Sequence, residues 1–388
     1  YRDPDILEGR FGTRYVGDMD RMFDSYSQLA ELVTNHVRST VVKGPKDSDF
    51  VYRQATRAKA LDAVRGLLPA SSLSNVGIYG SGQGYEQLLL RMRAHPLPEA
   101  RYYADMMLVE LRKVIPSFLR RVDVPERGVK WSDYLSTNTA AMTDIVDAIM
   151  GDDIATDVDE VSLIDFDPEG ENKLVAAACY QYSHLPESQI RMKVEAMSVA
   201  DKTDILNAYI GNRDNRRHRP GRAFESIDYR FDVLSDYGAF RDMQRHRLLT
   251  IEWQPLTPYH GYSRPELVDA AGGGEMFDEV MARSASLYDA LAADYPYQAS
   301  YAVSMAYRIR YVMQFNAREA MHMLELRSGP QGHPSYRRVA LEMHKQISEK
   351  AGHHAVAAAM SHMTTEVPEL ERLESERRQE SKRTAKEQ

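Results

Sequence analysis

The chain has 388 residues, 43% of them hydrophobic, so it can bury a large core, and two domains are the simplest expectation. Its formal net charge of −8 excludes a basic field over the whole surface for nucleic acid, so any anion site must be built locally. Its one cysteine, Cys179, excludes an internal disulfide and a multi-cysteine zinc site, and fits a reducing cytoplasm.

Amphipathic helices account for much of the pattern. Apolar residues recur at helical spacing over 18–37, 57–68, 98–114, 276–291 and 339–347. Pro69 would end the second of these helices, and Pro98 would begin the third. The stretch 366–388 is mostly charged and polar, which predicts a frayed helix or disorder.

Two stretches are predicted to be strands. Residues 161–166 form a short apolar run that ends before Asp167-Pro168, and residues 226–233 alternate between apolar and charged side chains. A short helix over 237–244 would follow the second strand. Together these elements predict an α+β fold with more helix than sheet, and no stretch is apolar for long enough to cross a bilayer.

A short internal repeat indicates duplication. A Leu-Arg pair ends at Arg91 and another ends at Arg327. Each arginine is followed at the same distance by a second one, Arg101 in the first case and Arg337 in the second. Both segments lie between predicted helices, so we expect two copies of one structural unit.

The most specific local string is Arg245-His246-Arg247, which follows the alternating strand and the short helix. Three adjacent cationic or nearly cationic side chains are costly to bury unless an anion compensates them. The string therefore indicates either an anion site or a solvated surface patch.

A second constellation consists of Asn316, Arg318, His322 and Arg327. Asn316 and Arg318 would lie near the start of a helix, where free N–H groups attract anions. The guanidinium of Arg327 suits a planar partner such as a pyrimidine edge or a phosphate. The alternative is an internal salt bridge with Glu319 or Glu325 on the same helix.

A third group contains five arginines in one predicted loop: Arg213, Arg216, Arg217, Arg219 and Arg222. Such a loop could bind phosphate, or it could be a charged loop that faces solvent. No metal site is predicted, because His344, His353 and His354 lack a suitable spacing to a carboxylate, and we expect them on helix surfaces.

Together these pieces resemble the flavin-dependent thymidylate synthase family. Its signature is R-H-R-x-x-S-x-N-E-x-S-x-R-Y, followed downstream by N-x-R and then by L-R and an E-I-R-x-x-A stretch. The matching positions here are Arg245, His246, Arg247, Thr250 in place of the first serine, Asn316, Arg318, Arg327, Arg337 and Ala340. The resemblance covers roughly residues 161–363.

The first part of the chain resembles the C-terminal half of another such unit. Its matching positions are Arg65 with Pro69, Arg91, Glu99, Arg101 and Ala104, and the front half of this unit would lie before Tyr1. The resemblance thus predicts four segments: a first half-unit over 1–122, a linker and helix over 123–158, a second unit over 159–365, and a charged tail over 366–388.

The sequence differs from the family in the stretch that binds the nucleotide in family members. After Thr250, the family's N-E-x-S-x-R-Y is replaced by Glu252-Trp253-Gln254-Pro255 and Leu256-Thr257-Pro258. The second unit also has Ser300 where the family has the arginine that Arg65 matches in the first. Because losses in one unit fall partly where the other is intact, we expect composite sites.

The resemblance implies a FAD-dependent enzyme that methylates dUMP to dTMP with methylenetetrahydrofolate, the flavin being reduced by NADPH. It implies that Arg327 is the catalytic residue, because an arginine that stabilises the pyrimidine as an N3 anion activates C5 without a cysteine. The implied flavin-binding residues are Arg245, His246, Arg247, Asn316, Arg318 and His322. The implied substrate-binding residues are Arg65, Arg91, Glu99, Arg101, Thr250 and Glu252.

Two alternatives remain open from the sequence. One is a non-catalytic duplicated scaffold, which the prolines beside Trp253 favour. The other is a flavoenzyme that acts on a different nucleotide-like substrate. Since family members are tetramers, the resemblance implies a cytoplasmic homodimer of two-unit chains that mimics a tetramer, with no nucleic-acid or membrane partner.

Overall fold

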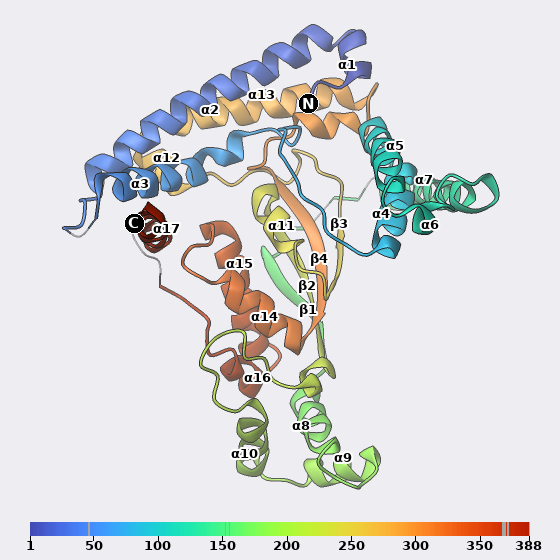
Figure 1. Cartoon of the computed structure of the whole chain (residues 1–388), viewed down its shortest axis with the longest axis vertical. Helices are drawn as coiled ribbons and strands as arrows, with labels where there is room; N and C mark the ends of the chain where they lie inside the picture. The colour runs from blue at the N-terminus through green and yellow to red at the C-terminus, as the bar shows by residue number, and fades with distance from the viewer. Residues whose placement is uncertain (46, 152, 155, 367–369, 371, 388) are drawn as a thin grey trace. The chain divides into compact units, whose positions relative to one another are not determined.

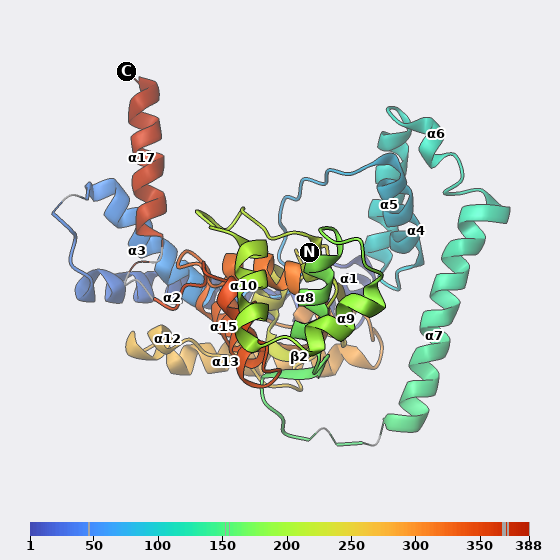
Figure 2. The same ribbon diagram turned by 90° about the horizontal axis from the view of Figure 1, so that it is seen from below.

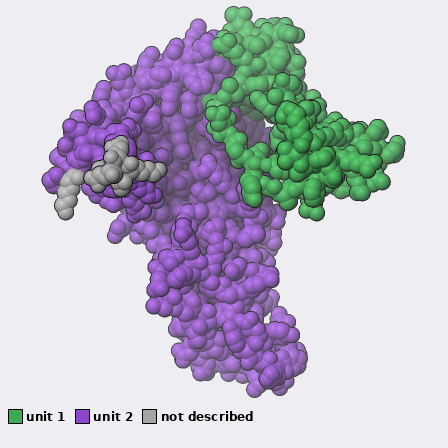
Figure 3. Space-filling view, viewed as in Figure 1, with its two compact units in different colours: residues 1–16, 71–157, 289–302 green, residues 17–70, 158–288, 303–388 purple. Residues whose placement is uncertain are grey.

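The structure is a computed structural model that describes residues 1–45, 47–151, 153–154, 156–366, 370 and 372–387. Its contacts divide the chain into two compact units that interleave in sequence (Figure 3). Unit 1 contains Tyr1–Val16, Ser71–Asp157 and Asp289–Ala302, and unit 2 contains Gly17–Ala70, Val158–Tyr288 and Val303–Gln388. The division by sequence repeat into 1–122, 123–158, 159–365 and 366–388 stays a prediction.

Unit 1 consists of helices and connecting loops in its described residues. Its helices are α1 (Pro4–Glu8), α4 (Gly82–Ala94), α5 (Pro98–Arg112), α6 (Pro116–Leu119), the π-turn η2 (Pro125–Val129), α7 (Lys130–Met150) and η4 (Gln298–Ala302). Pro98 begins α5 as predicted, because a proline at the first helical position loses no hydrogen bond. A small core forms where Leu89 and Leu90 of α4 pack with Ala104 and Leu108 of α5.

Unit 2 is built on one antiparallel sheet with strand order β1-β2-β4-β3. The strands are β1 (Val161–Phe166), β2 (Asp228–Asp236), β3 (Thr250–Trp253) and β4 (Arg308–Asn316). β1 has the predicted bounds, and β2 begins two residues after the predicted start. The predicted α+β class with more helix than sheet is confirmed, and the sheet is antiparallel.

The two faces of the sheet differ in polarity. Alternate residues of β2 and β4 are buried, including Tyr229, Phe231, Tyr311 and Phe315, and these pack into the main core. The intervening positions form polar cross-strand pairs, such as the ion pair between Arg310 and Asp232 at 3.0 Å. The apolar face is the one that packs against α15 (Figure 1).

Several helices of unit 2 were predicted from the sequence, but they begin or end at other residues than predicted. The helices of unit 2 are α2 (Gly12–Thr40, which begins in unit 1), α3 (Asp49–Val64), η1 (Arg65–Leu67), α8 (Gly170–Tyr180), α9 (Glu187–Glu195), α10 (Val199–Ile210), η3 (Arg222–Glu225), α11 (Tyr237–Met243), α12 (Glu266–Ala270), α13 (Gly274–Ala292, which ends in unit 1), α14 (Ala317–Arg327), α15 (Pro334–Glu349), α16 (His354–Ala359) and α17 (Leu373–Glu387). No helix among the described residues is long and apolar enough to cross a membrane.

The charged tail forms a helix in its described part. α17 packs on α3, as Figures 1 and 2 show, and Arg377 donates to the buried Asp47 at 2.6 Å. One expectation was wrong: His353 is buried, not on a helix surface, because its ring bonds to Tyr229 Oη at 2.7 Å and to the Asp167 carbonyl at 2.9 Å. Burial lowers the pKa of His353.

Candidate functional site

The candidate site lies where α11 and α14 end. β2 leads into α11 and β4 leads into α14, and the two strands are antiparallel neighbours, so the two helices begin at opposite ends of the strand pair. The last turns of the helices meet, because Asp242 of α11 pairs with Arg327 of α14. The segment after α11 contains the predicted Arg245-His246-Arg247 string.

The carboxylate of Asp242 collects three guanidinium groups. Arg245 Nη1 lies 3.1 Å and Arg327 Nη1 3.5 Å from Oδ1, while Arg65 Nη2 lies 3.7 Å from Oδ2. We call Asp242, Arg65, Arg245 and Arg327 the arginine cluster. Opposite charges at these distances attract, but only the contact with Arg245 is short enough for a normal hydrogen bond.

Arg65 enters the cluster from η1, far from the other members in sequence. It also pairs with Asp62, which pairs in turn with Arg372 at 2.7 Å. Four arginines therefore face two aspartates, an excess of two positive charges. Arg65 Nη2 is buried without a hydrogen-bond partner, and an unpaired buried donor is a costly arrangement that an anion would relieve.

Beside the arginine cluster, two histidines share one buried carboxylate oxygen. His246 Nδ1 lies 3.1 Å and His322 Nδ1 3.3 Å from Glu319 Oε1. Burial alone raises the pKa of Glu319, but the hydrogen bonds from the histidines outweigh burial and lower the pKa to about 2. We call His246, Glu319 and His322 the histidine–glutamate cluster.

Arg327 joins the two clusters. Its Nε donates to His246 Nε2 at 3.0 Å, and its guanidinium lies over the ring of Tyr336 with Cζ 5.4 Å from the ring centroid. Its Nη1 faces Asp242. The guanidinium of Arg327 is therefore contacted at Nε by His246, at Nη1 by Asp242 and on one face by Tyr336. Its plane is therefore fixed by the protein before any ligand binds.

The remaining predicted flavin residues have other contacts. Asn316 caps α14 by accepting from Glu319 N at 2.9 Å. Arg318 donates to the Pro220 carbonyl at 3.0 Å and to Glu225 at 3.3 Å. Arg247 is exposed, as are Thr250 and Glu252 of β3.

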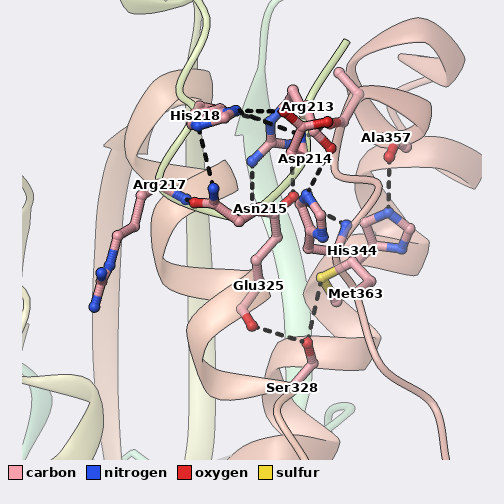
Figure 4. Close-up of polar contacts among 12 residues, drawn as sticks. Arg213, Asp214, Asn215, Arg217, His218, Glu325, Ser328, His344, Ala357 and Met363 are labelled. Carbon is pink, nitrogen blue, oxygen red and sulfur yellow. Dashed lines mark hydrogen bonds and ion pairs between the residues drawn. The ribbon is translucent and has the colours of Figure 1, made fainter.

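The predicted arginine loop does not act as one anion pocket. Arg213 is buried and binds both carboxylate oxygens of Glu325 at 2.7 Å (Figure 4). It also donates to the carbonyls of His218 and Ala359, so its donors are used internally. Arg222 pairs with Glu225 at 2.8 Å, and Arg217 and Arg219 are exposed. The predicted alternative for Arg327, a salt bridge with Glu325, is wrong, because Glu325 binds Arg213.

Three predicted substrate residues belong to unit 1. Arg91 is exposed on α4, and Arg101 donates to the carbonyls of His95 and Pro96. Glu99 accepts from Tyr301 Oη at 2.7 Å. Each contact lies within unit 1, and none joins these three residues to the arginine cluster.

Sequence reasoning missed Asp242 as a site residue and gave Glu319 only as an alternative partner for Arg327. Asp242 lies one helical turn before Arg245, so that spacing was the available signal. The ligand atoms of His246, Glu319 and His322 also lie within 4.8 Å of one another, a donor set that could hold a metal ion. Glu319 and His322 lie one helical turn apart on α14, but His246 comes from another segment, so local spacing indicated only two of the three members.

The chain is similar to proteins of one family over most of its length. The family model described as thymidylate synthase complementing protein matches residues 162–352. A UPF0159 protein of Chlamydia pneumoniae is 35% identical over 89% of this chain and 66% of its own length, and one of Chlamydia muridarum is 33% identical over 97% and 71%. A UPF0159 protein of Thermoplasma acidophilum is 29% identical over 95% and 77%.

The chain thus spans about two thirds to three quarters of the length of these relatives. Among solved structures, a UMP/dUMP methylase from Streptomyces cacaoi bound to 5-bromo-dUMP aligns with 51% of this chain and 94% of its own. The sequence identity is 16% and the TM-score is 0.38. A TM-score this low does not show a shared fold.

Proposed function

Because the chain belongs to the family of thymidylate synthase complementing proteins, we propose that it is a FAD-dependent enzyme that methylates a dUMP-like nucleotide. The proposed carbon donor is methylenetetrahydrofolate, and the proposed reductant of the flavin is NADPH. The site we propose is the arginine cluster together with the histidine–glutamate cluster.

One observation supports this proposal most: Arg65 and Arg327 converge on Asp242. The sequence pattern assigned them to different units, Arg65 as a substrate residue of the first and Arg327 as the catalytic residue of the second. A composite site of this kind would place one guanidinium at the nucleotide phosphate and another at the pyrimidine. Arg65 Nη2 makes no hydrogen bond and lies 3.7 Å from Asp242, so in this proposal it turns from Asp242 to donate to a phosphate oxygen.

Arg327 would act on the pyrimidine ring. A guanidinium held beside N3 and O4 stabilises the negative charge that develops when C5 becomes nucleophilic, and it does so most strongly when its plane is already fixed. The contacts with His246, Asp242 and Tyr336 provide that fixed plane. Arg91 and Arg101 of unit 1 remain proposed residues of a second site.

The residues present also fit a flavin. FAD has an anionic pyrophosphate, and we propose that it is bound by Arg247, which is exposed, and by Arg245 and Arg318, whose acidic partners Asp242 and Glu225 leave part of each guanidinium accessible. His322, also partly buried, would lie at the cofactor. When bound, FAD supplies the hydride that completes the methyl group. His246 is nearly inaccessible at 7% exposure, so its role here differs from the predicted direct contact.

Tritium release tests the proposal. The purified protein is mixed with FAD, NADPH, methylenetetrahydrofolate and dUMP labelled with tritium at C5. We expect release of tritium to water with the wild-type chain and a large loss with Arg327→Ala. Arg338→Ala, which removes a surface partner of Glu160 only, serves as the matched control. No release with the wild type would contradict the proposal.

A second candidate is a non-catalytic scaffold that binds the nucleotide. Trp253, Pro255 and Pro258 stand where the family grips dUMP, and Trp253 is 56% exposed. This candidate predicts binding of FAD or dUMP without tritium release. A flavoenzyme with another substrate would instead bind FAD and oxidise NADPH without dUMP turnover.

A further inference from the structure

Both ring nitrogens of His246 are engaged in hydrogen bonds, and this determines where its proton lies. Arg327 Nε always has a hydrogen and can only donate, so His246 Nε2 must accept at 3.0 Å. The single ring proton of a neutral His246 is then on Nδ1, from which it is donated to Glu319 Oε1 at 3.1 Å. The ring is 3% exposed in its side chain, so water does not compete for these partners.

Glu319 is the second partner that favours this arrangement, together with Arg327. Its side chain is 3% exposed, and Oε1 accepts from both His246 and His322. An oxygen that accepts from Nδ1 favours the Nδ1–H tautomer over the Nε2–H tautomer. Without Glu319, the Nδ1–H of His246 would have no acceptor, and Arg327 alone would favour this tautomer.

A metal ion in the histidine–glutamate cluster would require the opposite tautomer. Of the two ring nitrogens of His246, Nδ1 is the one that faces Glu319, so it is the nitrogen that would bind a metal ion held by this cluster. A metal on Nδ1 leaves the ring proton on Nε2, which would then face the N–H of Arg327 at 3.0 Å. Two donors cannot hydrogen-bond to each other, so the position of Arg327 opposes a metal ion here.

We propose that Glu319 is a positioning residue that fixes His246 as its neutral Nδ1–H tautomer, so that His246 holds and orients the guanidinium of Arg327. The tautomer is a property of the protein alone. Its consequence for turnover rests on the proposed function, in which Arg327 acts on the pyrimidine. Glu319 and His246 would thus affect the reaction through Arg327, without touching the nucleotide.

NMR of the histidine rings tests the tautomer without any ligand. In protein labelled with ¹⁵N-histidine, the signals of His246 are assigned by their loss in His246→Gln. We expect a protonated Nδ1 and an unprotonated Nε2 in the wild type. The same tautomer should persist in His322→Gln, which removes the other donor to Glu319, and in Glu319→Gln, whose amide oxygen still accepts.

Glu319→Leu removes the acceptor of Nδ1–H, so we expect a larger share of the Nε2–H tautomer than in the wild type, and its circular dichroism shows whether it folds. A protonated Nε2 in the wild type would overturn the proposal. So would an unchanged tautomer in folded Glu319→Leu, or a ring shift on addition of equimolar Zn²⁺. If Glu319→Leu does not fold, the wild type, Glu319→Gln and Zn²⁺ measurements decide.

Turnover provides the second test. We expect Glu319→Leu to lower kcat for tritium release at least tenfold with little change in KM for dUMP, and Glu319→Gln to restore most of kcat. Equal losses in both variants, or a loss confined to KM, would contradict the positioning role. Absence of tritium release from the wild type would refute the proposed function and leave the tautomer measurement standing as a separate result.

Discussion

Arg327 is the residue that connects the two clusters, because it contacts Asp242 in one and His246 in the other. Lysine at this position keeps a positive charge but lacks the Nε–H that donates to His246 and the planar group that lies over Tyr336. Loss of one oriented donor to a developing negative charge typically costs about 100- to 1,000-fold in rate. We expect Arg327→Lys to lower kcat for tritium release by about this factor, and Arg338→Lys to leave it unchanged.

The charge of Glu319 has a consequence for stability. Its folded-state pKa of about 2 lies below its ordinary value of 4.5, so it stabilises the fold above pH 4.5 and loses this contribution as the pH falls toward 2. We expect the difference in unfolding free energy between the wild type and Glu319→Gln to shrink over that pH range. Urea unfolding from pH 6 to pH 3 measures it, and a constant difference would contradict the assignment of the charge.

Only some residues of the candidate site could be identified from local sequence. The Arg245-His246-Arg247 string and Arg327 could be selected because their residue types and spacing are distinctive. The spacing of Asp242 to Arg245 indicates at most a local ion pair, and its contact with Arg65, a residue distant in sequence, could not be predicted. His246 is buried, whereas Arg245 and Arg247 are exposed. Local sequence could not show this difference, because the contact between His246 and Glu319 forms only when the chain folds.

A buried ion pair connects two elements of unit 2: Arg213, in the segment before η3, binds Glu325 of α14. Removal of one member of a buried ion pair leaves an uncompensated charge and typically costs about 3–5 kcal/mol. We expect Arg213→Met to destabilise unit 2 by about this amount in urea unfolding, and the double variant with Glu325→Leu to recover much of it. Arg217→Met, at an exposed position of the same segment, should change little.

The helices with a clear apolar stripe and two of the four strands of the described residues could be predicted, and the elements that could not have physical reasons. β3 has four residues, too few for a periodic signal. β4 alternates clearly, with Ile309, Tyr311 and Met313 on the buried face, but its other face carries arginines that pair across the sheet. In the sequence alone, where the partner strand is unknown, these arginines suggest a loop exposed to solvent. Helix ends shifted because caps such as Ser48, before α3, outweigh the apolar periodicity.

For the whole molecule, two-unit chains should assemble in pairs if the family resemblance extends to quaternary structure. We expect light scattering to give twice the chain mass of 44.2 kDa. A monomer at the concentrations used for activity would contradict this expectation. Because the chain spans 66–77% of the length of its relatives, the measurement should be repeated on a longer form of the protein.

The central claim is that Arg65 and Arg327 form one anion site around Asp242. Calorimetric titration of dUMP into the protein in the presence of FAD tests it most directly, with Arg65→Ala, Arg327→Ala and the control Arg338→Ala. A hydrogen bond to a charged group contributes about 1.5–3 kcal/mol, so each of the first two variants should weaken binding at least tenfold. Equal affinity in all four proteins, or no binding of dUMP to the wild type, would contradict the claim.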